Sequence, residues 1–531
     1  MKDTHPPKWK LAIAAVLSGV LWPLACADFD IWLLGWIAML PTLWIAIRAR
    51  SRKQALLFAL LAGTIANAGG FYWIAGLLER FGKLPTPVAY VGLFGFAAYQ
   101  GLGFMVMAWA TRSIRRTSLL KRGKPLPLAL VAPITIASVE LLHPVIFPFY
   151  LAITQAWVVP VIQIADVTGP IGVSALLVMT SGALLDAWEK SGRARGFAIG
   201  IPALIVLLVI GYGQIRIGQT DAARAKAKKI AVGIVQANIA FDRKNEPGRG
   251  QRQLLALRKK TDELMEKGAQ FIVWSETVYP YRISRALQHD TGPKDPYRIR
   301  NKNGVPMLIG AVTADPSTPE KSPYNTAIML SKDGKVLGMF DKVFLLIFGE
   351  YTPLADTFEF VRNAVPKAAS HFTRGDNFNT LPLHHDGNEY RVGAMICYED
   401  IIADFGRKIA KHRPHLLVNL TNDAWFGETS EPWEHMALSV YRSVELRTDL
   451  VRAVNTGVSA IIDSSGRVLE KTYAVDPSIH PKEIDSLMGE AALLEGGHTF
   501  FSRFGNVFAW LCVVLTFLGW IVWPRIRPKQ N

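Results

Sequence analysis

The stretch VGAMICYEDI, residues 392–401, indicates what kind of domain occupies the middle of this 531-residue chain. It begins with an apolar run of the length that is typical of a buried strand. The run ends at Cys397, the only cysteine between residues 229 and 495, and a tyrosine and two carboxylates follow it directly. The stretch therefore predicts a strand that presents a single thiol at its end, where loops commonly display functional groups.

Residues 229–495, on either side of this stretch, alternate short apolar runs with amphipathic segments. We predict strands over 229–238, 269–276, 305–313, 325–331, 335–341, 390–397, 415–423, 450–457 and 459–469. We predict helices over 251–267, 399–412 and 433–448, the first of them ending before Gly268. This alternation predicts a layered α/β domain whose strands are buried on both faces.

The remaining residues are far more apolar than a soluble domain. Hydrophobic residues make up 50% of the chain and charged residues only 19%, against about 25% charged in an average soluble domain. A membrane-spanning helix needs roughly 20 mostly apolar residues. We predict eight spans, over 11–27, 31–47, 55–78, 87–110, 127–152, 158–186, 196–213 and 505–523. Prolines in the fifth and sixth spans leave the count open by one.

The predicted architecture is therefore a polytopic α-helical membrane protein that carries an α/β domain. An N-terminal membrane domain of about seven spans covers residues 1–215, and a last transmembrane helix covers 505–523. Basic residues gather in every second loop, at 2–10, 48–53, 112–124, 190–195 and 525–529. Because such clusters mark the cytoplasmic side, both termini should be cytoplasmic and residues 229–495 should lie outside. The clusters also account for much of the formal charge of +16, so no nucleic-acid partner is expected.

The N-terminus allows a second interpretation. Lys8 and Lys10, an apolar run and the sequence ACA at 25–27 imitate a cleavable signal peptide. We favour a retained first span. Cleavage would leave the large domain on the same side of the membrane but would place the amino end outside.

Three reactive residue types stand at predicted strand ends. Glu276 ends one apolar run, Lys342 follows another, and Cys397 ends a third. Alone, each has a simpler explanation, because a Glu or Lys after a strand is usually a solvated charge and a Cys is usually part of the core. Together they are a carboxylate, a cation and a nucleophile, each at the end of a predicted strand, and this combination favours a functional role without settling it.

Four blocks in this order carry a family resemblance: IVWSET, DKVFLLIFGEYTP, GAMICYED and NLTNDAWFG. They resemble the nitrilase, or carbon–nitrogen hydrolase, superfamily. Joined to the predicted spans and to RAVNTGVSAIID near residue 458, they resemble the apolipoprotein N-acyltransferase family over nearly the whole chain. The resemblance implies an αββα sandwich with Glu276 as general base, Lys342 as catalytic lysine and Cys397 as nucleophile.

The resemblance also implies supporting and lining residues. Glu350 matches a second glutamate that supports the site, and Tyr398 and Glu399 match the pair beside the nucleophile. Trp425 and Phe426 are candidates for lining an acyl pocket, although core packing is an equally good explanation. Two features depart from the family pattern. Ser275 replaces a proline before the glutamate, and the apolar run 344–347 replaces a run that begins with histidine.

The function that the resemblance implies is acyl transfer at the bacterial inner membrane, the last step of lipoprotein maturation. The donor would be a phospholipid, and the acceptor the α-amine of an S-diacylglyceryl cysteine that begins an apolipoprotein. The α/β domain would be periplasmic and the protein a monomer in the lipid bilayer. No cofactor or metal is expected, because the sequence has no CxxC pair, HExxH run or Walker-type loop.

Two alternatives remain open at this point. A membrane-anchored amidase of the same superfamily would share the three reactive residues and use water as acceptor. A transporter or sensor would use the outer domain only to bind a ligand. Glu140 and Asp166, in or near predicted spans, favour that second alternative, since intramembrane charge is usually functional.

Overall fold

The computed structural model describes residues 5–27, 29–239, 248–315, 317, 323–346, 349–351, 371–474 and 484–521. These residues form two compact units. The helical unit comprises residues 1–79, 84–218 and 504–531, and the α/β unit comprises residues 80–83 and 219–503.

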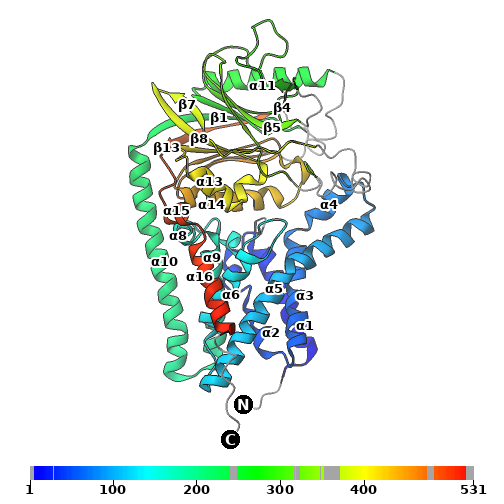
Figure 1. The fold of residues 1–531 in the computed structure, drawn as a ribbon, viewed down its shortest axis with the longest axis vertical. Helices are drawn as coiled ribbons and strands as arrows, with labels where there is room; N and C mark the ends of the chain where they lie inside the picture. Colours follow the sequence, from blue (N-terminus) through cyan, green and yellow to red (C-terminus); the bar gives the residue numbers. More distant parts are fainter. Residues whose placement is uncertain are drawn as a thin grey trace. The chain divides into compact units, whose positions relative to one another are not determined.

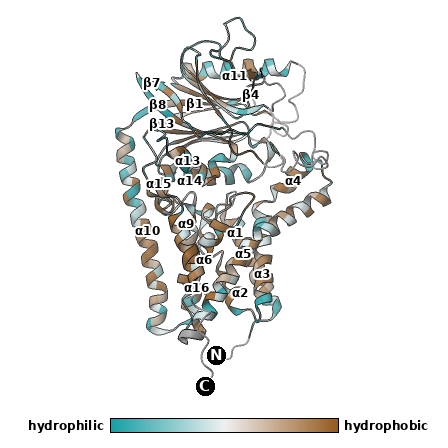
Figure 2. Cartoon of the chain, in the orientation of Figure 1, coloured by the Kyte–Doolittle hydropathy of each residue, from teal (hydrophilic) through white to brown (hydrophobic). Residues whose placement is uncertain are grey.

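The helical unit is built almost entirely from apolar helices, as Figure 2 shows by its colouring. Its long helices are α1 (Lys8–Ala25), α3 (Arg52–Gly70), α5 (Thr86–Arg122), α6 (Leu128–Leu142), α9 (Pro170–Glu189), α10 (Gly192–Lys226) and α16 (Val507–Ile521). Its short helices are η1 (Trp32–Trp36), α2 (Leu40–Arg48), α4 (Trp73–Arg80), η2 (Leu151–Gln155), α7 (Val159–Ile162) and α8 (Ala165–Thr168). Helix α15 (Phe500–Phe504) lies at the end of the α/β unit.

Among the described residues, four helices, α1, α5, α9 and α10, are long and apolar enough to cross a membrane. Helices α3 and α4 together make a fifth candidate, although they are bent by 61° at the break between them. The other predicted spans correspond to shorter apolar helices. The segment 158–186 is divided into α7, α8 and α9, and Gly169 and Pro170 form the break between α8 and α9. Several spans are therefore compatible with the structure, and the count of eight stays a prediction.

Small residues bring the helices of this unit close together. A Cβ atom on Gly63 of α3 would lie 2.7 Å from the carbonyl oxygen of Gly101 on α5. A Cβ on Gly182 of α9 would lie 2.7 Å from the backbone of Leu128 on α6. Such close backbone approach is how helices pack in lipid, where apolar burial gives them little driving force.

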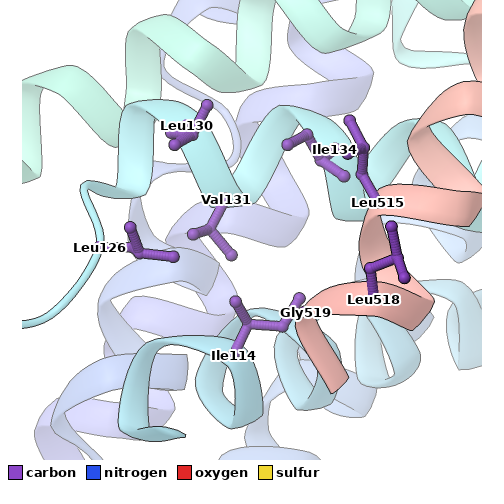
Figure 3. Close-up of a pocket in the computed structure, with 8 residues that line it drawn as sticks. All are labelled: Ile114, Leu126, Leu130, Val131, Ile134, Leu515, Leu518 and Gly519. Carbon is purple, nitrogen blue, oxygen red and sulfur yellow. The ribbon is translucent and has the colours of Figure 1, made fainter. Parts of the chain in front are cut away.

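An apolar cavity of about 300 Å³ lies between α5, α6 and α16 (Figure 3). Its lining residues are Ile114, Leu126, Leu130, Val131, Ile134, Leu515, Leu518 and Gly519. None of them can donate or accept a proton, so this cavity is not the candidate site for chemistry.

The α/β unit contains two sheets packed face to face. The first has the order β13-β1-β2-β4-β5-β6, with β3 paired to β4, and the second has the order β12-β11-β10-β9-β8-β7. The first-sheet strands are β1 (Lys228–Gln236), β2 (Phe271–Trp274), β3 (Arg282–Ser284), β4 (Met307–Ala314), β5 (Tyr324–Leu330), β6 (Val336–Asp341) and β13 (Asp485–Leu493). The second-sheet strands are β7 (Leu381–His385), β8 (Asn388–Ile396), β9 (Leu416–Thr421), β10 (Leu450–Val454), β11 (Gly457–Ile462) and β12 (Val468–Ala474).

Helices cover the outer faces of both sheets (Figure 1). Helix α11 (Arg249–Glu266) buries Leu254, Leu257 and Leu264 against the first sheet. Helices α13 (Ala403–Ala410) and α14 (Glu431–Leu446) cover the second sheet. The four layers are an αββα sandwich, so the predicted fold class is confirmed. Within it, the predicted helix 399–412 is divided into a 3-10 turn, η3 (Cys397–Ile401), and α13.

Candidate active site

The three predicted reactive residues follow the ends of β2, β6 and β8. Glu276 lies two residues beyond β2, Lys342 directly follows β6, and Cys397 directly follows β8 and begins η3. All three side chains are buried, with Lys342 only 1% exposed. The structure brings these residues together, although 66 positions separate Glu276 from Lys342.

A glycine on the neighbouring strand makes room for the turn that carries Glu276. A Cβ atom on Gly310 of β4 would lie 2.2 Å from the carbonyl oxygen of Ser275 and 2.7 Å from the Cα atom of Glu276. Thr277 continues this turn with a positive φ of 46°, a left-handed conformation that is costly for a β-branched residue. The turn is therefore held by its surroundings, as is common for strained backbone at functional sites.

Lys342 is the centre of a buried charge cluster. Its Nζ atom lies 3.1 Å from Oε1 of Glu276 and 2.7 Å from Oε2 of Glu350. Burial lowers the pKa of Lys342, but Cys397 and the two glutamates raise it more, and the net shift is well above its usual value. Burial raises the pKa of Glu276, which Lys342 partly offsets. The lysine is therefore held as a cation, and burial favours the protonated form of Glu276 more than in an exposed glutamate.

Cys397 holds the thiol on a strained turn. Its φ is 55°, in the left-handed region. Burial raises the pKa of the Cys397 thiol well above its usual value, whereas the Lys342 charge lowers it. The lysine thus favours the thiolate, but burial outweighs it. Burial therefore favours the protonated form of the Cys397 thiol, and the charge of the nearby Glu276 acts in the same direction.

Glu399 ties the turn of Cys397 to the loop of Lys342. Its Oε1 accepts hydrogen bonds from the backbone N–H groups of Val343 and Phe344, at 2.6 and 2.9 Å. Its Oε2 accepts from the N–H of Ile396 at 2.8 Å. Burial raises the pKa of Glu399 to about 8, against these three donors, which lower it. This glutamate therefore fixes the thiol turn relative to the lysine loop.

Tyr398 and Glu350 also contact the lysine or its loop. The Tyr398 hydroxyl donates to the carbonyl oxygen of Leu345 at 2.9 Å, and its ring centroid lies 5.9 Å from Nζ of Lys342. Glu350 accepts from the N–H of Leu346 at 3.0 Å. Both residues therefore contact the lysine and its loop, and their supporting role in catalysis stays a prediction.

The apolar run 344–347 forms part of this loop. Phe344 packs edge-on against Phe405 of α13, with ring centroids 5.9 Å apart. Residue 347 lies outside the described residues. Phe344, one of the described residues of this run, therefore packs the loop against α13 of the α/β unit.

Trp425 and Phe426 lie at the end of the 3-10 turn η4 (Asp423–Trp425). The ring centroids of Trp425 and Phe81 are 4.6 Å apart, and Nη2 of Arg80 donates to the Phe426 carbonyl at 2.7 Å. Arg80 and Phe81 belong to the short segment 80–83 that is grouped with the α/β unit. The two aromatic residues therefore anchor this segment, and their acyl-pocket role stays a prediction.

Asn325 is a site residue that the sequence did not single out. From β5 its Nδ2 donates to Oε1 of Glu276 at 2.7 Å and to Oε1 of Glu350 at 3.0 Å. An asparagine in a strand gives no distinct pattern. Only the place of β5 between β4 and β6 in the sheet could have indicated that Asn325 faces the two glutamates.

A second buried polar cluster lies beside the thiol turn. Asp423, Glu431 and His435 are close enough for one cation to touch all three. The His435 ring, however, also lies 2.8 Å from Asp400, and Arg452 lies 3.3 Å from Asp423. Two cationic side chains already balance the carboxylates, so we assign the cluster to ion pairing.

Comparisons with known proteins cover both units. The family described as apolipoprotein N-acyltransferase N-terminal domain matches residues 18–183, and carbon–nitrogen hydrolase matches residues 231–491. A Geobacter metallireducens protein named apolipoprotein N-acyltransferase is 31% identical over 94% of this chain and 93% of its own. A Bdellovibrio bacteriovorus protein of the same name is 30% identical over 86% of this chain and 85% of its own.

Solved structures match part of this chain at low identity. Saccharomyces cerevisiae Nit3, a nitrilase-superfamily member, is 16% identical, with a TM-score of 0.36 over 57% of this chain and 97% of its own. An amidase from Nesterenkonia sp. is 18% identical, with a TM-score of 0.35 over 50% of this chain and 90% of its own.

Proposed function

This chain belongs to the apolipoprotein N-acyltransferase family, and from that premise we propose that it acylates lipoproteins through a thioester on Cys397. The acyl donor is a membrane phospholipid, and the acceptor is the N-terminal α-amine of an S-diacylglyceryl-cysteine apolipoprotein. The observation that carries the proposal is the buried contact of Lys342 with Glu276 and Glu350 beside the Cys397 thiol.

In the first half-reaction the thiol attacks the ester carbonyl of the phospholipid. Glu276 accepts the thiol proton as the sulfur–carbon bond forms, because the buried thiol is protonated at rest. Lys342 and the backbone N–H of Tyr398 stabilise the negative charge on the tetrahedral oxygen. The intermediate collapses by breaking the ester bond, and Glu276 returns the proton to the departing lysophospholipid oxygen.

In the second half-reaction the α-amine of the apolipoprotein attacks the thioester. Glu276 accepts a proton from the attacking nitrogen, and the same two donors stabilise the second oxyanion. Collapse breaks the carbon–sulfur bond and forms the amide, and Glu276 gives its proton to the departing sulfur, which restores the thiol. Splitting the transfer in this way replaces one difficult step with two easier ones.

The location that fits this chemistry is the bacterial inner membrane, with the α/β domain on the periplasmic side. The basic clusters at 48–53 and 112–124, in alternate loops, support cytoplasmic termini. We further propose that the chain divides into a membrane domain over 1–215, a catalytic domain over 229–495 and a last span over 505–523. A membrane-impermeant reagent should therefore label lysines of the catalytic domain, such as the exposed Lys302, in intact spheroplasts.

The test is intact-protein mass spectrometry of the full chain after incubation with phospholipid of one defined acyl chain. The mass should rise by one acyl group, and peptide mapping should place that group on Cys397. Cys397→Ala and Cys397→Ser should insert and fold but gain no acyl group and transfer none. Substantial transfer by Cys397→Ala would overturn the nucleophile assignment.

Glu276→Gln tests the general base. The amide keeps the shape of the side chain but cannot accept a proton, so the thioester should not accumulate. Normal thioester build-up in this variant would show that another group deprotonates the thiol in the first step.

A further inference from the structure

The carbonyl group of the nucleophile is held by a side chain from the next strand. Nδ2 of Asn419, in β9, donates to the backbone oxygen of Cys397 at 2.9 Å. Asn419 is fully buried, and it pairs in register with Met395 of β8, two residues before the thiol. It therefore reaches past the end of β8 to the first residue of the turn.

The orientation of the Asn419 amide is set from its other side. Arg452 of β10 is in register with Asn419, and its Nη1 lies 3.4 Å from Oδ1 of Asn419. A guanidinium only donates hydrogen bonds, so it faces the amide oxygen. The NH₂ group is then left to face the Cys397 carbonyl.

Arg452 is in turn fixed by two carboxylates. Its Nη1 lies 2.6 Å from Asp400 and its Nη2 lies 3.3 Å from Asp423. His435 of α14 joins the same pair, with Nε2 2.8 Å from Asp400 and Nδ1 3.2 Å from Asp423. Because both ring nitrogens face carboxylate oxygens, both donate, and the ring is a cation. Two cations and two anions make a balanced, buried network.

A third carboxylate does not disturb this balance. Glu431 lies 3.7 Å from the His435 ring, and burial followed by the Asp423 charge raises its pKa well above the usual value. Burial and the Asp423 charge therefore favour the neutral form of Glu431 beside the network. The network is rigid because each of its charged groups has a buried partner of opposite sign.

The geometry of the peptide bond gives this network a consequence for catalysis. No cis peptide bond occurs in the described chain, so the Cys397 C=O and the Tyr398 N–H point in opposite directions. A side chain that fixes the carbonyl therefore also fixes the N–H. We propose that Asn419, held by Arg452 and its ion pairs, is a positioning residue that aims the Tyr398 N–H at the tetrahedral oxyanion. This inference rests on the proposed function, in which that N–H is one of two oxyanion donors.

The experiment compares two reactions of the same thiol in the full chain. Acyl transfer passes through an oxyanion, whereas alkylation of Cys397 by iodoacetamide displaces iodide at a methylene carbon and forms none. Asn419→Leu should lower kcat for acyl transfer by about 100- to 1000-fold, the usual cost of losing one oxyanion donor. KM for phospholipid should stay unchanged, because the donor acts only in the transition state. The rate of Cys397 alkylation, followed by peptide mapping, should stay within about twofold of wild type, because alkylation forms no oxyanion for the donor to stabilise.

Thr261→Val is the matched control. It also removes a buried hydrogen-bond partner in the same unit, since Oγ1 of Thr261 accepts from Nε1 of Trp274 at 2.9 Å. Its kcat should match wild type. If Asn419→Leu does not fold, Asn419→Ser is the second variant, because its side chain is too short to reach the carbonyl. It should show the same lowered kcat for transfer with an unchanged rate of alkylation.

Three outcomes would overturn the inference. Full transfer activity in Asn419→Leu would show that the amide does not position the donor. An equal fall in transfer and alkylation, or failure of both variants to fold, would show a purely structural role. Cys397→Ala is measured in parallel as a separate test of the proposed function. Transfer activity in Cys397→Ala would overturn the proposed thioester on Cys397. If Cys397→Ala is inactive and Asn419→Leu is fully active, only the role of Asn419 is overturned.

Discussion

Nδ2 of Asn325 donates a hydrogen bond of 2.7 Å to Oε1 of Glu276, the same oxygen that lies 3.1 Å from Nζ of Lys342. One carboxylate oxygen of the proposed base therefore accepts from both a neutral amide and a cation. Both donors favour the charged carboxylate, and burial opposes them. The pKa of Glu276 is the outcome of this competition, and it lies above the usual value for a glutamate.

Replacing Asn325 should move the pH dependence of the first half-reaction. Asn325→Leu removes a donor that lowers the pKa of Glu276, so the acid limb of kcat/KM should move to higher pH. A hydrogen bond to a charged group contributes roughly 1.5–3 kcal/mol, which corresponds to a shift of about 1 to 2 pH units. Thr261→Val should leave the limb in place. If the acid limb of kcat/KM stays at the same pH in Asn325→Leu, a group other than Glu276 determines that limb.

The close approach at Gly310 predicts a second effect on Glu276. Gly310→Ala would place a methyl group 2.2 Å from the Ser275 carbonyl, so the turn that carries Glu276 must shift. Displacing a catalytic group by about 1 Å can cost roughly 100-fold in rate. Gly338→Ala is a matched control, because its methyl group would meet only the flexible end of Leu381, at 3.0 Å. Equal kcat values in the two variants would contradict the role given to Gly310.

Local patterns were enough to predict much of the α/β unit. The apolar runs at β1, β2, β4, β5, β6, β8 and β9 were predicted because each is bounded by polar or turn residues. The three reactive residues were found because each ends such a run. Strand β13 was missed, since DSLMGEAAL has mixed polarity, and only its antiparallel pairing with β1 makes it a strand.

Tertiary contacts explain the rest of what the sequence could not show. Asn325, Asn419 and Arg452 lie inside strands, where a single polar residue in an apolar run carries no signal of its partner. Their partners lie in the turns that follow other strands: Glu276, after β2, for the first, and Cys397 and Asp400, in η3 after β8, for the second and third. In the helical unit, Gly169 and Pro170 mark the break before α9, but composition does not predict the break at residues 71–72, which depends on a local turn.

The ion pairs of His435 predict a pH-dependent contribution to stability. Burial and the Arg452 charge lower the pKa of His435, but Asp400 and Asp423 raise it more, to about 10. Since the pKa is raised from about 6.5 in the unfolded chain, the contribution is fully present below about pH 6.5. It is lost as pH rises from there through about 10.

His435→Gln should therefore lower the Tm of the full chain most at acidic and neutral pH. Removing one partner of a buried ion pair costs about 3–5 kcal/mol, and the Tm gap from wild type should narrow between pH 7 and pH 10. His412→Gln, at an exposed histidine, is the control and should show no gap. A gap that is constant with pH would show that the His435 ring is neutral at every pH.

The acceptor step separates a transferase from a hydrolase that shares Glu276, Lys342 and Cys397. The attacking α-amine must be uncharged, so discharge of the thioester should accelerate as pH rises towards about 7.7–8.0, the usual pKa of an α-amino group.

With phospholipid alone the acyl-enzyme should persist, because Cys397 is only 6% exposed and a site closed to water protects reactive intermediates. A diacylated lipopeptide with a free N-terminus should discharge the thioester and gain one acyl group, and an N-acetylated lipopeptide should leave it intact. The intact mass of the enzyme, followed over time at several pH values with each peptide, measures this directly. Rapid loss of the acyl group as free fatty acid, at a rate independent of the peptide amine, would mean that water is the acceptor and that the chain acts as a hydrolase.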